Sequence, residues 1–144
     1  MNVLTHFIAA EEDEIAAIGE SLRPIDEWSG IERHGIDTEK IVMLHSLLTD
    51  DEFDLAVGLY EPVYIGSEGA VVLHLADVVT EKLAALEEEA IEQIADELAA
   101  TETFETEGWP DEDVHALMFD LAELARLAEA QGQSLFVWIN PLLT

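Results

Sequence analysis

Histidine and carboxylate side chains are the groups in this chain that could carry out acid–base chemistry. His45 stands out because it falls on one helical face with Ile41, Leu44 and Leu48. An imidazole on such a face can act as a general base when a carboxylate such as Asp37 orients it. The alternative, which we favour, is a buried structural histidine that hydrogen-bonds to a loop. Only geometry can establish a general base.

The spacing of the possible metal ligands argues against a metal site. No His-x-x-x-His or His-Glu-x-x-His pair occurs, and no Asp-x-Asp-x-Asp-Gly calcium loop is present. His6 and His74 fall on predicted strands and would face one another only if those strands pair. Because the chain has 33 Asp and Glu residues, acidic pairs such as Asp50 and Asp51 arise by chance. We therefore expect neither a metal nor a cofactor.

The common nucleophile and phosphate-binding motifs are also missing. The sequence contains no Gly-x-Ser-x-Gly and no Gly-x-x-x-x-Gly-Lys-Ser/Thr. It has no cysteine, which excludes disulfides and thiolate chemistry. These absences favour a protein without enzymatic activity. A small ligand-binding or hydrolase-like protein that uses His45 with nearby carboxylates remains the alternative.

Aromatic residues beside the expected connectors are the candidate binding residues. Trp28, Tyr64 and Trp109 each lie in or next to such a segment, and aromatic side chains often anchor protein interfaces. The alternative is that they fold back over the ends of a small core. Trp138, in a strongly apolar run, is expected in the core itself.

The net charge of −28 restricts the partners of the protein. Five Lys and Arg residues against 33 Asp and Glu make the approach of nucleic acid or an anionic membrane unfavourable. A basic protein is the partner that such a surface would steer and select, as in an immunity-like protein. The competing explanation is adaptation to high salt, where screening relieves the self-repulsion. A homo-oligomer is also compatible with the sequence.

The first half of the chain predicts a buried strand followed by two helices. Residues 2–9 alternate with both faces apolar, which is typical of a strand covered on both sides. Residues 12–22 show helical spacing, and residues 23–36 read as a connector. A second helix begins after Asp37, a good N-cap residue, and ends near Thr49. Residues 52–60 fit neither pattern cleanly.

The second half predicts a hairpin, a helical pair, a long helix and a last strand. Apolar runs at 62–65 and 70–75 flank a glycine-containing turn. Residues 77–100 are helical with an angle near 87–89, and 101–110 form a loop. A helix over 111–131, capped by Asp111 or a nearby acid, ends at Gly132. Residues 134–139 fit a central strand.

These elements predict one α+β domain over residues 1–144, with a small mixed or antiparallel sheet covered by several helices. The length of 144 residues suits a single domain, and the 49% hydrophobic content is enough for a core. Neither a secretory signal nor an apolar run of membrane-spanning length is visible. A cytoplasmic location follows as the expectation.

The order of these landmarks resembles the YfbM-like family of uncharacterised bacterial proteins. The resemblance rests on Trp28-Ser29-Gly30-Ile31, on Gly35-Ile36-Asp37 with Lys40, and on Leu44-His45-Ser46-Leu47-Leu48-Thr49. Phe104, Trp109-Pro110 and Gln131-Gly132 carry it near the end of the chain. It implies an α+β fold and brings no catalytic scheme, although Asp37 and His45 match recurring positions. Asp50 departs from the pattern, because a glycine commonly follows the Leu-Thr pair.

Overall fold

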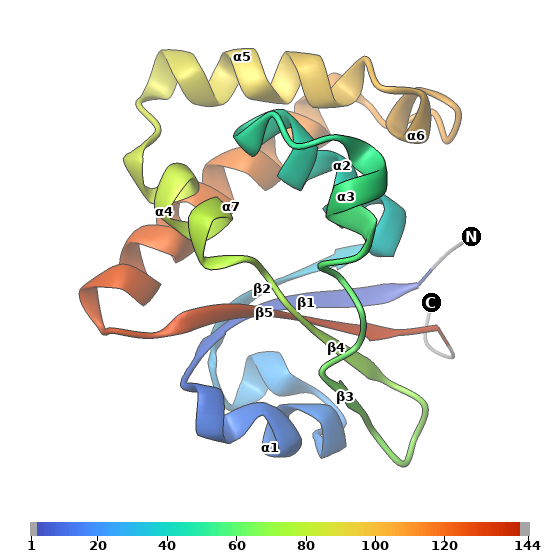
Figure 1. The fold of residues 1–144 in the computed structure, drawn as a ribbon, viewed down its shortest axis with the longest axis vertical. Helices are drawn as coiled ribbons and strands as arrows, with labels where there is room; N and C mark the ends of the chain where they lie inside the picture. The colour runs from blue at the N-terminus through green and yellow to red at the C-terminus, as the bar shows by residue number, and fades with distance from the viewer. Residues whose placement is uncertain (1–2, 142–144) are drawn as a thin grey trace.

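A five-stranded antiparallel sheet forms the centre of the molecule (Figure 1). The computed structural model of the protein describes residues 3–141. The strands follow the order β2-β1-β5-β4-β3, and each neighbouring pair is antiparallel. Their bounds are β1 Leu4–Ala10, β2 Ser29–His34, β3 Tyr64–Ile65, β4 Val71–His74 and β5 Ser134–Asn140. The predicted α+β class, the hairpin and the central position of the last strand are confirmed.

The neighbouring strands β1 and β5 bury both of their faces. In β5, Leu135 and Val137 enter a large core, whereas Phe136 and Trp138 enter a smaller core on the opposite face. β1 alternates in the same way, and all of its residues are buried. Successive strand side chains point to opposite faces, so a strand covered on both sides reads as a continuous apolar run.

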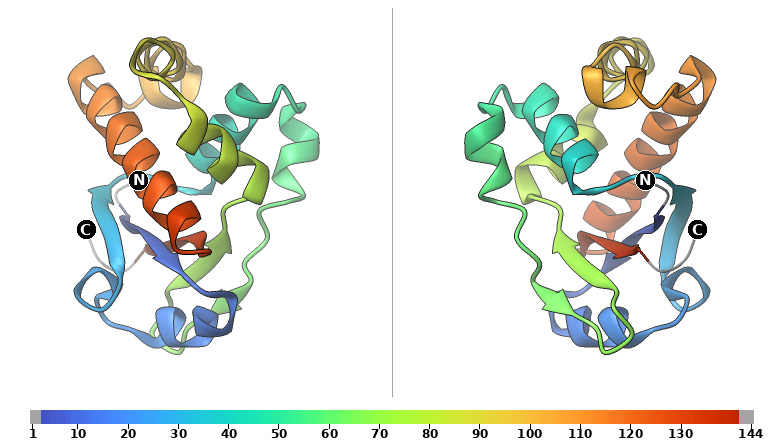
Figure 2. Two further views of the ribbon diagram at one scale, coloured as in Figure 1. Left: turned by 90° about the vertical axis from the view of Figure 1, so that its left-hand side faces the viewer. Right: turned by 90° about the vertical axis from the view of Figure 1, so that its right-hand side faces the viewer.

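Helices cover one face of the sheet much more heavily than the other (Figure 2). The long helix α7 (Asp111–Ala130) contacts the strands directly and also packs against α4 (Asp77–Ala85) and α5 (Glu88–Ala99). α1 (Ile15–Glu20) lies on the opposite face with two 3₁₀ turns, Glu12–Glu14 and Pro24–Asp26. No helix within residues 3–141 has the length and apolar character needed to cross a membrane. The remaining helices are α2 Thr38–Thr49, α3 Phe53–Val57 and α6 Glu102–Glu105.

Three segments differ from the sequence-based expectation. The predicted connector 23–36 contains the edge strand β2, whose polar residues and partial exposure hide its β character. The predicted loop 101–110 contains the short helix α6, and the undecided segment 52–60 contains α3. Pro110, not Asp111, is the N-cap residue of α7, and no side chain there caps the helix by a hydrogen bond. The acids of that first turn still favour the positive end of the helix.

Local signals at other helix ends are confirmed. The Asp37 carboxylate accepts a hydrogen bond from the backbone N–H of Lys40 at 3.1 Å, so Asp37 caps α2 as predicted. Gly132 has a φ of 68°, the left-handed conformation of a C-terminal glycine. Gly66 has a different role: an added Cβ would lie 2.1 Å from the Gly19 carbonyl oxygen. The hairpin turn can therefore rest directly on α1.

Candidate functional site

The buried His45 lies at the centre of a hydrogen-bonded chain of side chains. Its Nδ1 is 2.8 Å from the Tyr60 hydroxyl, and its Nε2 is 2.8 Å from a carboxylate oxygen of Asp51. The Tyr60 oxygen accepts a hydrogen bond from the Ala76 backbone N–H at 3.2 Å. Tyr60 can therefore donate its own proton to Nδ1, which leaves the Nε2–H of His45 to donate to Asp51.

This arrangement corrects the expected pairing of His45 with Asp37. Both ring nitrogens of His45 are occupied by Tyr60 and Asp51, whereas Asp37 caps α2. Burial raises the pKa of Tyr60 to about 12, so its phenol stays protonated at neutral pH. The hydrogen bond from His45 lowers the pKa of Asp51. These hydrogen bonds connect the end of α2 with Tyr60 and with the start of α4, which indicates a structural role for His45.

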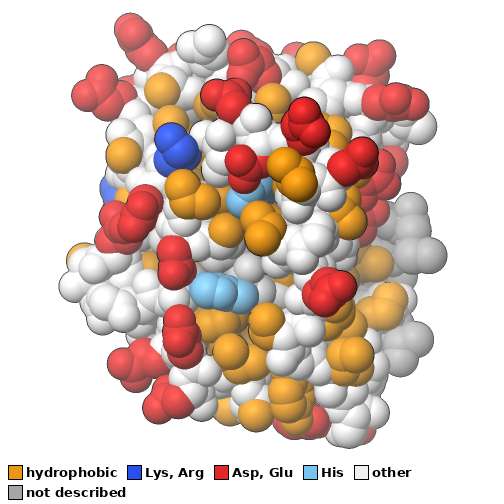
Figure 3. Space-filling view, in the orientation of Figure 1, with side chains coloured by type: hydrophobic (Ala, Val, Ile, Leu, Met, Phe, Trp, Pro, Cys, Tyr) orange, Lys and Arg blue, Asp and Glu red, His pale blue; other side chains and the backbone are white. Residues whose placement is uncertain are grey.

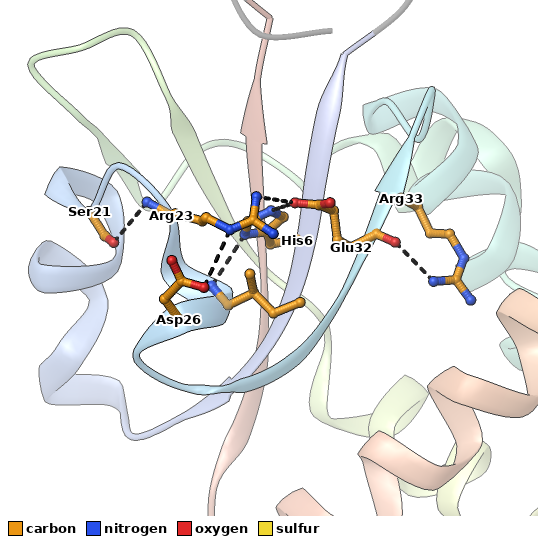
Figure 4. A network of polar contacts seen from close by, with 7 residues as sticks. His6, Ser21, Arg23, Asp26, Glu32 and Arg33 are labelled. Atoms are coloured by element: carbon orange, nitrogen blue, oxygen red, sulfur yellow. Dashed lines mark hydrogen bonds and ion pairs between the residues drawn. The ribbon is translucent and has the colours of Figure 1, made fainter.

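The buried His6 is part of a second polar network, on the other side of the sheet (Figure 4). Its Nε2 lies 2.7 Å from a Glu32 carboxylate oxygen, and its Nδ1 accepts a hydrogen bond from the Ile25 backbone N–H at 3.3 Å. Arg23 also binds Glu32, at 2.8 Å, and the His6 ring lies against Trp138 at a centroid distance of 4.7 Å. The network attaches the segment before β2 to strands β1 and β2.

The burial of His6 predicts a specific pH dependence of stability. Desolvation lowers the pKa of His6, although the hydrogen bond to Glu32 opposes that effect. The folded state therefore keeps the ring neutral, while the unfolded chain takes up a proton below about pH 6.5. His6 should thus cost stability as the pH falls from 6.5 to its folded pKa, by at most about 1.4 kcal/mol per pH unit.

The matched variant His6→Gln isolates this contribution from the titration of the many acids. We expect urea denaturation to show a larger loss of unfolding free energy for the wild-type protein than for His6→Gln between about pH 7.5 and about pH 5.5. Equal losses in the two proteins would contradict the assignment. Glu32, whose pKa the hydrogen bond from His6 lowers, contributes its effect at still lower pH.

Most of the other possible metal ligands lie apart from one another in the structure. His115 pairs with Asp96 at 2.7 Å, and His74 lies 3.2 Å from Asp77. His6 and His74 do not face one another, because β5 separates β1 from β4. Within residues 3–141, one group of three carboxylates has ligand atoms close enough to share an ion: Glu11, Asp13 and Glu14. Glu14 already accepts hydrogen bonds there, and these acids are mostly exposed, so the group is not assigned as a metal site.

The three candidate binding aromatics are half-buried and packed. Trp28 donates to Glu14 at 2.9 Å, and Tyr64 donates to Glu20 at 2.7 Å. Trp109 lies edge-on to a buried phenylalanine at 5.3 Å between centroids. All three pack against core residues, which agrees with aromatic side chains covering the ends of the core. Trp138 is fully buried, as predicted.

A buried lysine is a feature that the sequence reasoning missed. Lys40 is 1% exposed, and its ammonium lies 2.6 Å from Glu107 and 3.6 Å from Asp37. The same nitrogen is 5.7 Å from the centroid of the Phe104 ring. Its spacing of four residues from Leu44 was a signal of this burial, because i and i+4 share a helix face.

Exposed apolar side chains gather on α3 and the segment that leads to β3. In this region Ala56 and Tyr60 are buried, and Tyr64 is half-buried against core residues. We call the six exposed members the apolar strip; their exposed fractions run from 36% to 67%. They are Phe53, Leu55, Val57, Leu59, Val63 and Ile65. In the sequence, residues 52–60 fitted neither a helical nor a strand pattern, and the structure leaves four of their apolar side chains exposed.

Comparisons with protein-family models, with curated proteins and with solved structures found no match to this chain. The resemblance to the YfbM-like family therefore stays a prediction.

Proposed function

We propose that this protein is a cytosolic, non-enzymatic interaction module that binds a basic protein through the apolar strip. The observation that carries the proposal is that α3 buries a small apolar residue and leaves its larger apolar residues exposed to solvent. This helix contacts the body through Ala56, while the larger Leu55 and Val57 are 67% and 47% exposed. Large apolar side chains left exposed along one segment are candidates for an interface, because extensive exposed apolar surface commonly marks one.

The local charge supports a basic partner. Between Asp50 and Glu68 the chain carries six acidic residues and neither Lys nor Arg; the acids are at positions 50, 51, 52, 54, 61 and 68. Figure 3 shows acidic side chains spread among apolar ones over the face on which α3 lies. Acidic groups around an apolar centre steer a basic protein and reject an acidic one, while the apolar contacts supply affinity.

The double variant Leu55→Ser/Leu59→Ser tests this proposal. Both side chains are more than half exposed, so the fold should lose no more than about 0.5 kcal/mol. We expect the wild-type protein, used as bait in a lysate of its source cells, to retain a basic protein that the variant does not retain. Loss of two interface leucines should weaken binding by at least about 30-fold, measured by titration with the purified partner.

Val78→Ser is the matched control, because Val78 is 41% exposed but lies on α4, outside the strip. It should retain the partner fully, and added salt should weaken the association. Equal retention by the strip variant would contradict the proposal. Self-association through the strip would instead appear as a concentration-dependent dimer that Leu55→Ser/Leu59→Ser abolishes, and this outcome would also overturn a basic partner.

A further inference from the structure

A groove lies beside the apolar strip, between α2, α3 and α6. Its volume is about 470 Å³, and Met43 and Phe53 supply the apolar part of its wall. Glu39, Glu102 and Glu107 supply the acidic part, together with Thr103 and Thr106. Phe53 belongs both to this groove and to the strip, so the two surfaces are continuous.

The carboxylates of the groove are not equivalent. Glu107 is bound by the buried Lys40 at 2.6 Å, and this ion pair belongs to the fold. In the described part of the chain, no ion pair within 4.0 Å involves Glu39 or Glu102, and both residues are exposed. The groove therefore offers two uncompensated negative charges beside an aromatic ring. Only a cation with an apolar stem complements both features.

We propose that the groove receives an arginine side chain of the basic partner. A guanidinium is planar and carries five N–H donors, so it can bind carboxylates and threonine hydroxyls while its face lies on the Phe53 ring. An ammonium is a compact, strongly hydrated charge and lacks the stacking face. The inference rests on the proposed function and names the chemistry by which the partner is anchored next to the strip.

The experiment titrates the ¹⁵N-labelled protein with N-acetyl-arginine-N-methylamide and follows the backbone amide shifts by NMR. We expect saturable shifts centred on Glu39, Met43, Phe53 and Thr103, in a buffer of moderate ionic strength. The lysine analogue should bind at least about threefold more weakly, and the norleucine analogue should leave these amides unchanged.

The variant Glu39→Gln/Glu102→Gln should weaken arginine binding by about tenfold, because both charge-assisted contacts are lost. Glu88→Gln/Glu92→Gln removes the same charge from exposed positions on α5 and should bind as the wild type does. Shifts spread over many acids, equal for arginine and lysine, would reduce the effect to counter-ion binding and overturn the inference. Retention of the partner by the strip variant overturns the proposed function instead, so the two failures are distinguishable.

Discussion

Replacing Glu107 by glutamine is expected to lower the free energy of unfolding by about 3 kcal/mol, because it leaves a buried ammonium without its main counter-charge. Lys40 is 1% exposed, and its nitrogen lies 2.6 Å from Glu107 but 3.6 Å from Asp37. An uncompensated buried charge costs far more than the net contribution of the intact pair. The pair also holds the residues after α6 against α2.

Variants of both members of this ion pair should show a distinctive order of stabilities. Lys40→Met should lower the free energy of unfolding by only about 1 kcal/mol, because it leaves no unpaired charge in the core. The side chain of Glu107 is 34% exposed, so water can solvate its carboxylate once the lysine is gone. The double variant Lys40→Met/Glu107→Gln should therefore be more stable than Glu107→Gln alone. Urea denaturation of the four proteins measures the cycle. A Glu107→Gln protein as stable as the wild type would show that the ion pair contributes nothing.

Replacing His45 by alanine is expected to lower the free energy of unfolding by about 3 kcal/mol. The side chain is fully buried, and its ring fills space beside Tyr60 in an edge-on contact with centroids 5.4 Å apart. Its removal leaves a cavity and takes away the acceptor of the Tyr60 hydroxyl. Asp51 loses less, because its side chain is 46% exposed and can bind water.

Tyr60→Phe is the companion variant for this prediction. It removes only the hydroxyl that joins His45 to Ala76, and the expected cost is about 1.5 kcal/mol. Both variants should still bind the partner under conditions in which they are folded. Unchanged stability of His45→Ala together with loss of binding would contradict the structural role and restore a functional one.

The sequence predicted the elements whose signals are local. Asp37 and Gly132 mark helix ends through their own hydrogen bonds or dihedral angles, and the apolar run of β5 marks a strand buried on both faces. β2 escaped prediction because an edge strand pairs on one side only and can carry polar residues, as Glu32 and Arg33 show. α6 escaped because four residues are too few for a periodic pattern.

For the candidate site too, the sequence predicted local features and the tertiary structure determined the contacts between distant residues. The sequence by itself predicted that His45 lies on an apolar helix face and that Trp138 belongs to the core, and its excess of acidic residues determined the net charge. Only the tertiary structure decided that Asp51 and Tyr60 bind His45, that Lys40 is buried against Glu107, and that α3 turns its large apolar residues outward. Hydrophobic periodicity reports which residues share a face, because that depends on neighbours in sequence. Which partner meets that face, or whether solvent does, depends on how distant segments pack.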